Sequence, residues 1–142
     1  MNKIWVISNK LYNKPKIWHY LARFFELLNM IINSNAISTK AKIGKNTIFH
    51  HHGIGCVIHD NSVIGSECNI FQNVTIGSQW SNGICEGSAP VIGNRVFIGA
   101  GAVILGKVTI GDNARIGANA VVISDVPSDT VAVGIPAKII MK

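Results

Sequence analysis

The chain has 142 residues, a formal net charge of +6 and 48% hydrophobic residues, with charged residues making up only 14%. This length suits a single domain with a buried core, and this composition argues against a disordered chain. The basic residues are dispersed along the sequence and form no concentrated patch, so we expect no nucleic-acid partner.

The cysteines and the first residues bear on the compartment. Cys56, Cys68 and Cys85 are odd in number and lack CxxC spacing, so we expect neither a disulfide framework nor a zinc knuckle. A reducing cytoplasm fits this pattern best. Residues 1–16 make a poor signal peptide, and residues 17–32 are interrupted by charges and too short to span a membrane. The expected localisation is therefore cytoplasmic.

The first element expected along the chain is an amphipathic helix over residues 17–32, inside an N-terminal helical segment that spans residues 1–35. Its apolar residues recur at helical spacing: Ile17, Leu21, Phe24, Leu28 and Ile31. One interpretation packs this face on the following domain or on a neighbouring subunit. The alternative is peripheral contact with the inner membrane, which a basic chain with Trp5 and Trp18 near this end would favour.

Residues 36–142 show a six-residue period that neither a helix nor an alternating strand explains. Aliphatic residues occupy every sixth position in two runs: Ile58, Ile64, Ile70, Ile76, Ile92, Ile98, Ile104, Ile110, Ile116 and Val122. Such a period predicts a short strand and a tight turn, repeated, with the aliphatic residue in the core. Three units make one triangular coil of about eighteen residues, and the coils stack. We therefore expect an all-β domain, a parallel β-helix of hexapeptide repeats.

The repeat fails at two places, and insertions in solenoids often form binding faces. The first break lies between Phe49 and Ile58 and contains three consecutive histidines in "HHHGIGCVI". The second is the loop "SQWSNGICEGSAP" at residues 78–90, which is rich in turn-forming residues. The coil register places the histidines beside residues 71–73, with alanines of later coils further along the same groove.

The chain resembles the hexapeptide-repeat acyltransferases, and within them the serine acetyltransferase-like branch. The resemblance covers residues 36–140 and is carried by "IGSECNIFQNVTIG", "VIGNRVFIGAGAVILGKVTIGDNARIGANAVV" and "VAVGIPAKII". It implies a left-handed coil, a homotrimer, and acyl transfer from acetyl-coenzyme A as the donor. Members of this fold that resemble carbonic anhydrase are metal-dependent, so a metalloprotein stays an alternative.

A histidine is the expected general base, because imidazole can remove a proton from an alcohol near neutral pH. In the resembled enzymes the catalytic histidine precedes a short glycine turn. Counting forward from "AKIG" gives His51, which we prefer, and counting backward from "VIG" gives His52. The acids that would orient the imidazole in the family fall at His50 and Ala36, so the orienting group is unassigned.

No metal site is expected at the histidines. Successive residues of a regular strand point to opposite faces, so His51 could not readily share one ion with His50 and His52. No acidic or cysteine residue stands at ligand spacing from them.

The resemblance also implies where the donor and the acceptor bind. Coenzyme A would contact Gly77, Ala100, Ala118 and Lys138. The arginine-histidine pair that helps grip serine in true serine acetyltransferases is replaced by Ser88 and Ala89, and an α-carboxylate would lose its bidentate partner.

The sequence therefore favours a sugar hydroxyl as the acceptor, in a surface polysaccharide such as O-antigen or capsule. The saccharide could be lipid-linked. Its binding residues would be Gln72, Asn73 and Trp80, which offer neutral hydrogen bonds and an aromatic face. The alternative is serine O-acetylation in cysteine biosynthesis.

Overall fold

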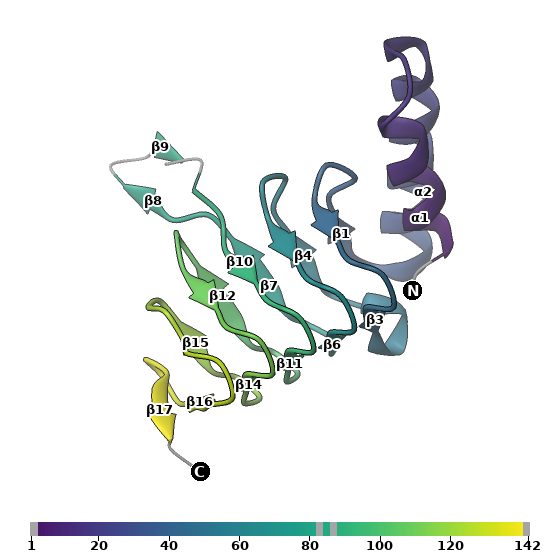
Figure 1. Cartoon of the computed structure of the whole chain (residues 1–142). Coiled ribbons are helices and arrows are strands. Elements are labelled where there is room, and N and C mark those ends of the chain that lie inside the picture. The colour runs from purple at the N-terminus through teal and green to yellow at the C-terminus, as the bar shows by residue number, and fades with distance from the viewer. Residues whose placement is uncertain (1–2, 82–83, 86–87, 141–142) are drawn as a thin grey trace.

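Three helical elements precede the strands in the computed structural model, which describes residues 3–81, 84–85 and 88–140. They are α1 (Lys3–Tyr12), the 3₁₀ helix η1 (Lys16–Trp18) and α2 (His19–Asn33). The two α-helices pack on each other and lie at one end of the stack of strands (Figure 1). The sequence predicted only one of these helices and missed α1.

The strands form three parallel faces of a β-helix, which we call sheets A, B and C. Sheet A holds β1 (Ala36–Ile37), β4 (Val57–Ile58), β7 (Thr75–Gly77), β12 (Val103–Leu105) and β15 (Val121–Val122). Sheet B holds β2 (Lys42–Ile43), β5 (Val63–Ile64), β10 (Val91–Ile92) and β13 (Thr109–Ile110). Sheet C holds β3 (Ile48–Phe49), β6 (Asn69–Ile70), β11 (Phe97–Ile98), β14 (Arg115–Ile116), β16 (Val131–Val133) and the antiparallel β17 (Lys138–Ile140).

The six-residue period produces this fold because each aliphatic residue at the repeat position points inward. Ile70, Ile98 and Ile116 lie in register on three neighbouring strands, and each is fully buried. The same holds on sheet A for Ile76 and Ile104. Burying an isoleucine side chain stabilises the fold by about 1.5–3 kcal/mol, so these columns dominate its stability. The predicted β-helix and its register are confirmed.

The loop between β7 and β10 leaves the stack of coils, as the sequence predicted for residues 78–90. It contains two short antiparallel strands, β8 (Trp80–Ser81) and β9 (Ile84–Cys85). Among the described residues they pair only with each other, and they project from the edge of the coils (Figure 1). The loop is therefore an addition to the scaffold and not a part of its core.

The helices sit on the first coil with an unexpected orientation. Trp5 of α1 is only 4% exposed and its Nε1 donates to the Ser38 carbonyl oxygen at 3.0 Å. The buried residues of α2 are Ala22 and Asn29, whereas Phe24 and other apolar residues of that helix are exposed. Within this chain the interpretation that the apolar face of residues 17–32 packs on the β-helix is wrong. Trp5 is likewise unavailable to a membrane.

No helix within the described ranges is long and apolar enough to cross a membrane. The last helix ends at Asn33, two residues before the end of the expected helical segment 1–35, and the first strand begins at Ala36. Whether residues 1–35 and 36–142 act as separate units stays a prediction, as does the cytoplasmic localisation.

Candidate functional site

The consecutive histidines form a tight turn and not a strand. They make up η2 (His50–Gly53), in which His51 and His52 have φ values of 52° and 59°. These values lie in the left-handed region, which is uncommon for residues other than glycine. The strand pleat on which the sequence argument separated the three imidazoles is therefore absent, and that premise is wrong. The turn places both His51 and His52 at the surface.

The ring of His50 lies closer to the next coil than that of His51, whose centroid is 6.5 Å from that of Phe71. The His50 imidazole stacks on Phe71 with ring centroids 4.3 Å apart and an interplanar angle of 15°. Its Nε2 lies 3.0 Å from Asn69 Oδ1. Phe71 in turn lies 5.2 Å from the Phe97 ring of the next coil. His50 is thus part of the wall of the site and supports the turn.

A chain of asparagine side chains holds the histidine turn against α2. Asn35 Nδ2 donates to the His52 carbonyl oxygen at 3.2 Å, and Asn35 Oδ1 accepts from Asn29 Nδ2 at 2.7 Å. Asn33 Nδ2 then donates to Asn29 Oδ1 at 2.8 Å. Asn29 and Asn35 are 2% and 4% exposed, so these bonds form away from water, where they are strong. Sequence reasoning left the orienting group unassigned and missed Asn35, which has no motif of its own.

The turn lies at the first position of a column of corner turns between sheets C and A. Asn73 donates its backbone N–H to the Ile54 carbonyl oxygen at 2.8 Å, which links the histidine coil to the next one. Gly101 N–H donates to Gln72 O, and Asn119 N–H to Ala100 O, at 3.0 and 2.9 Å. The predicted alignment of the histidines with residues 71–73, Ala100 and Ala118 is confirmed. Ala118 is exposed, so this corner has an open, small-residue surface.

The two amide residues proposed for the acceptor differ in what they offer. Gln72 Oε1 is buried and has no hydrogen-bond partner among the residues described. A buried acceptor without a donor is costly, so it is suited to a ligand that brings one. Asn73 takes a φ of 60°, and its Oδ1 lies beneath Gly55, where any Cβ would meet it. Asn73 therefore has a structural role in coil stacking.

Gly77 lies on sheet A, next to the corner and not in its column. It lines a pocket of about 530 Å³ together with Val57, Thr75, Gln79 and Leu105. An added Cβ at Gly77 would come within 3.2 Å of Leu105 Cδ2, so the pocket floor is already tight there. The structure thus places one of the four expected coenzyme A residues on a neighbouring face from Ala100 and Ala118.

The remaining site residues lie at two separate places. Lys138 is exposed on β17, paired with Val133, and so belongs to the coil farthest from the histidines. The backbone of Trp80 is in β8, but its side chain lies outside the described residues. Ser88 and Ala89 are half-buried beside the start of β10.

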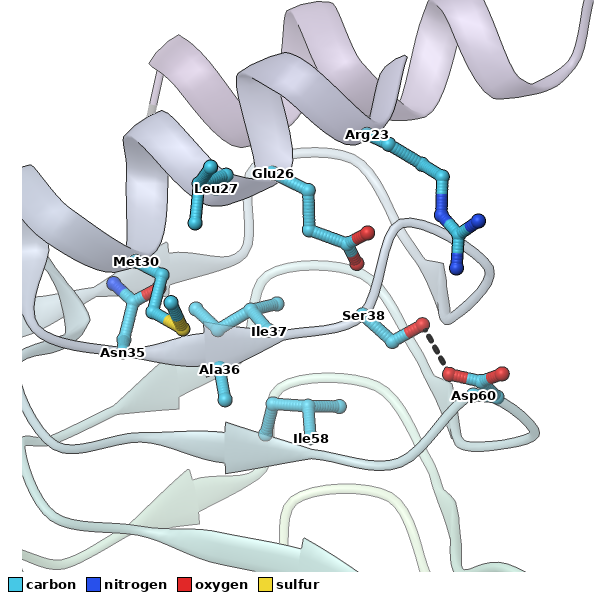
Figure 2. A pocket seen from close by; sticks show the side chains of 10 residues that line it. All are labelled: Arg23, Glu26, Leu27, Met30, Asn35, Ala36, Ile37, Ser38, Ile58 and Asp60. Carbon is cyan, nitrogen blue, oxygen red and sulfur yellow. Dashed lines mark hydrogen bonds between the residues drawn. The ribbon is translucent and has the colours of Figure 1, made fainter. Parts of the chain in front are cut away.

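A second pocket, of about 400 Å³, opens between α2 and the first coil (Figure 2). Its apolar wall includes Leu27 and Met30, and its polar end holds Asp60, whose Oδ1 accepts from Ser38 Oγ at 2.6 Å. Lys40 Nζ lies 2.7 Å from the other carboxylate oxygen. The hydrogen bonds from Lys40 and then Ser38 hold the pKa of Asp60 below its usual value. None of the site residues expected from the sequence lines this pocket.

Neither metal nor thiol chemistry has support in the described ranges. No group of three His, Cys, Asp or Glu side chains there could hold a metal ion. Cys56 and Cys68 are both buried, and burial raises the pKa of each thiol, which makes them inert.

Comparison with known proteins decides the family. A model of bacterial transferase hexapeptide repeats matches residues 89–124. The chain is 43% identical over 126 residues to a serine acetyltransferase of Helicobacter pylori strain J99, covering 88% of this chain and 71% of that protein. The chain belongs to the serine acetyltransferase family. This membership confirms the left-handed β-helix and an acyltransferase class that uses acetyl-coenzyme A.

Solved serine acetyltransferases superpose closely on the chain. One, described as a complex with CoA, has a TM-score of 0.83 and 35% identity, covering 96% of this chain and 54% of that one. A soybean serine acetyltransferase complexed with serine has a TM-score of 0.86 and 34% identity, covering 96% and 54%. The chain thus spans about half the length of these structures.

The expectation of a sugar acceptor in polysaccharide biosynthesis is wrong. The relatives are serine acetyltransferases, at 43% identity for the H. pylori protein and 39% for one from Staphylococcus aureus strain Mu50. Ser88 and Ala89 are only two positions in an inserted loop, whereas the similarity to serine acetyltransferases covers 88% of the chain.

Proposed function

We propose that the chain is a serine O-acetyltransferase that transfers an acetyl group from acetyl-coenzyme A to the serine hydroxyl. The observation that carries the proposal is the 43% identity over 88% of the chain, together with an exposed histidine turn at the end of a small-residue groove. A free hydroxyl is a weak nucleophile, so the reaction needs a base beside it. His51 and His52 are the candidates because both are exposed, whereas the imidazole of His50 is stacked on Phe71.

In the proposed reaction a single histidine both removes and returns the proton. The imidazole accepts the proton of the serine hydroxyl as that oxygen attacks the thioester carbonyl carbon. The carbon–sulfur bond then breaks, and the imidazolium returns the proton to the departing thiolate. The products are O-acetylserine and free coenzyme A. Gln72 Oε1, which is buried and lacks a donor in the described part of the chain, is suited to accept a hydrogen bond from the serine ammonium.

We place acetyl-coenzyme A along the corner groove. Ala100 and Ala118 leave room for a thin ligand along the corner, and Gly77 contributes to the pocket on sheet A. Lys138, at the far end, would offer a positive charge to phosphate groups. We also propose a homotrimer, because the corner is an open surface whose second wall must come from another copy. A monomer found by sedimentation at micromolar concentration would contradict this assembly.

The deciding experiment follows thiol release from acetyl-coenzyme A with the purified protein. Serine should stimulate release, and mass spectrometry should find O-acetylserine in equal amount. Threonine, homoserine and a nucleotide sugar serve as matched acceptors that should give little release. If serine gives no more thiol than buffer while the protein is folded, the proposed acceptor is wrong.

A further inference from the structure

The outward side of α2 is largely apolar. We call this side the α2 apolar face and define it by residues of η1 and α2 that are each at least 40% exposed and do not line the pocket beside the first coil: Ile17, Tyr20, Leu21, Phe24, Ile31 and Ile32. The spacing of three and four residues puts them on one stripe of the helix. Ile17, Tyr20 and Ile31 are the most exposed, at 78%, 82% and 69%.

The helix is inverted relative to an ordinary surface helix, because its polar residues face the protein. Asn29 is buried on the inward side, and Glu26 is half-buried there and accepts a hydrogen bond from the Thr39 N–H at 3.2 Å. Ser8 of α1 donates to the Ala22 carbonyl oxygen at 2.7 Å on the same side. These polar contacts fix the rotation of α2 and leave its apolar side outward. A contiguous exposed apolar surface of this kind marks an interaction site.

Charge indicates which partner fits the face. Residues 1–35 contain five basic residues and a single acidic one, Glu26. Lys14 and Lys16 are exposed at the N-terminal end of the face, and Lys14 Nζ lies 5.4 Å from the centroid of the exposed Trp18 ring. Glu26 is turned inward, so its carboxylate does not lie on the face. A second copy would bring the same positive charges together, whereas an anionic surface would attract them.

We propose that the α2 apolar face docks on an anionic lipid surface, with the helix lying in the plane of the interface. The apolar side chains enter the boundary between headgroups and acyl chains, while Lys14 and Lys16 contact anionic headgroups. Trp18 and Tyr20 are aromatic residues of the type that favours the headgroup level. The described helices are too short and polar to cross a membrane, which fits a helix that lies on it. The proposal is independent of acetyl transfer.

The test is co-sedimentation of the full chain with vesicles. One set contains phosphatidylglycerol and phosphatidylcholine in equal parts, and the other contains phosphatidylcholine alone. The protein should pellet with the anionic vesicles and at least tenfold less with the neutral ones. Raising salt from about 0.1 M to about 1 M shortens the Debye length from about 10 Å to about 3 Å and should weaken binding. Lys14→Gln with Lys16→Gln should lower partition by roughly tenfold or more.

Substitutions distinguish binding through the α2 apolar face from non-specific adsorption to vesicles. Phe24→Asp with Ile31→Asp should abolish pelleting without lowering the melting temperature, because both side chains are exposed. Ile123→Asp is the matched control, since Ile123 is 60% exposed in the loop after β15, far from the helices. It should bind as the wild type does.

Three outcomes would overturn the proposal. The first is that the wild-type chain does not bind anionic vesicles at all, and the second is that the Phe24→Asp, Ile31→Asp variant binds them equally well. The third outcome is an assembly in the absence of lipid that this variant splits, because the face would then be covered by a second copy of the chain.

Discussion

The His50 imidazole lies against the Phe71 ring at 4.3 Å while its Nε2 meets Asn69 Oδ1 at 3.0 Å. Both contacts come from the next coil, so the first member of the histidine run is anchored to the scaffold. His51 and His52 follow it in left-handed backbone conformations and are exposed. Among three identical side chains, the two with exposed rings are the ones suited to take a proton.

Alanine substitution should separate the three histidines. Replacing the general base, His51 or His52, should lower kcat by about 10²-fold or more, because positioned acid-base catalysis contributes that much. His50→Ala should have a smaller effect on kcat and should lower the melting temperature, since it removes the contact with Phe71. Steady-state kinetics and thermal unfolding of the three variants measure this. Near-wild-type turnover in both His51→Ala and His52→Ala would contradict a histidine base.

A bulky side chain in the corner groove should interfere with the donor. Ala118→Leu should raise the KM for acetyl-coenzyme A by roughly tenfold while leaving stability unchanged, because residue 118 is exposed and its side chain points to solvent. Ser124→Leu, at another exposed position, is the control and should leave that KM unaltered. An unchanged KM in Ala118→Leu would move the donor site away from this corner.

The loop ahead of β10 should limit serine affinity. Ser88→Arg with Ala89→His restores the pair that grips the acceptor in the resembled enzymes, and a charge-assisted bond to the carboxylate is worth about 1.5–3 kcal/mol. We therefore expect the KM for serine to fall about tenfold or more. The matched variant Ser88→Gln with Ala89→Asn, which adds size without charge, should not reproduce the change. A KM that does not fall would show that the carboxylate lies elsewhere.

A single methyl group added at a corner turn should destabilise the fold. Gly101 has a φ of 71°, and a Cβ there would collide with Asn119 Oδ1 of the next coil. Gly101→Ala should therefore lower the free energy of unfolding by more than about 1–2 kcal/mol. Gly134→Ala is the matched control, since φ is 98° but the nearest atom to its Cβ is 3.6 Å away. Denaturant unfolding of both variants measures the cost of the collision with Asn119. Equal losses in the free energy of unfolding would contradict this collision.

The Lys40–Asp60 ion pair should make the free energy of unfolding depend on pH in the acidic range. Hydrogen bonds from Lys40 and Ser38 keep the pKa of Asp60 below its usual value, so the folded state favours the carboxylate. This contribution is present above the unfolded pKa of about 3.9 and is lost as pH falls through the lower folded pKa. Both side chains are nearly half exposed, so the loss is less than about 1 kcal/mol. Asp60→Asn should remove this part of the pH dependence in unfolding experiments at pH 2 to 6.

The β-helix could be predicted from sequence because its period is repeated many times. Each aliphatic position from Ile58 to Val122 repeats the same local rule, so the register of Ile70, Ile98 and Ile116 follows from counting. The α-helical end could not be predicted as well. The rotation of α2 depends on buried polar contacts of Asn29 and Glu26, which a helical pattern of apolar residues does not reveal.

The location of the candidate site could be predicted from the sequence, but the backbone conformation and contacts of its residues could not. The break in the period located the histidines, and the register located Ala100 and Ala118. The backbone of η2 could not be read, since left-handed conformations at His51 and His52 are exceptions to the preference of these residues. Asn35 was missed because its contact with the His52 carbonyl joins residues seventeen positions apart, with no repeat to indicate it.

The two ends of the β-helix are chemically unlike, and this limits polymerisation. A stack of parallel coils exposes open strand edges at both ends, and such edges can template another copy. At one end α1 covers the first coil, where Asn9 Nδ2 donates to the Thr39 carbonyl oxygen and Trp5 Nε1 to that of Ser38. At the other end β17 runs antiparallel to β16, which interrupts the parallel pattern. Both features disfavour head-to-tail growth of copies into a fibre, because neither end presents a plain parallel edge.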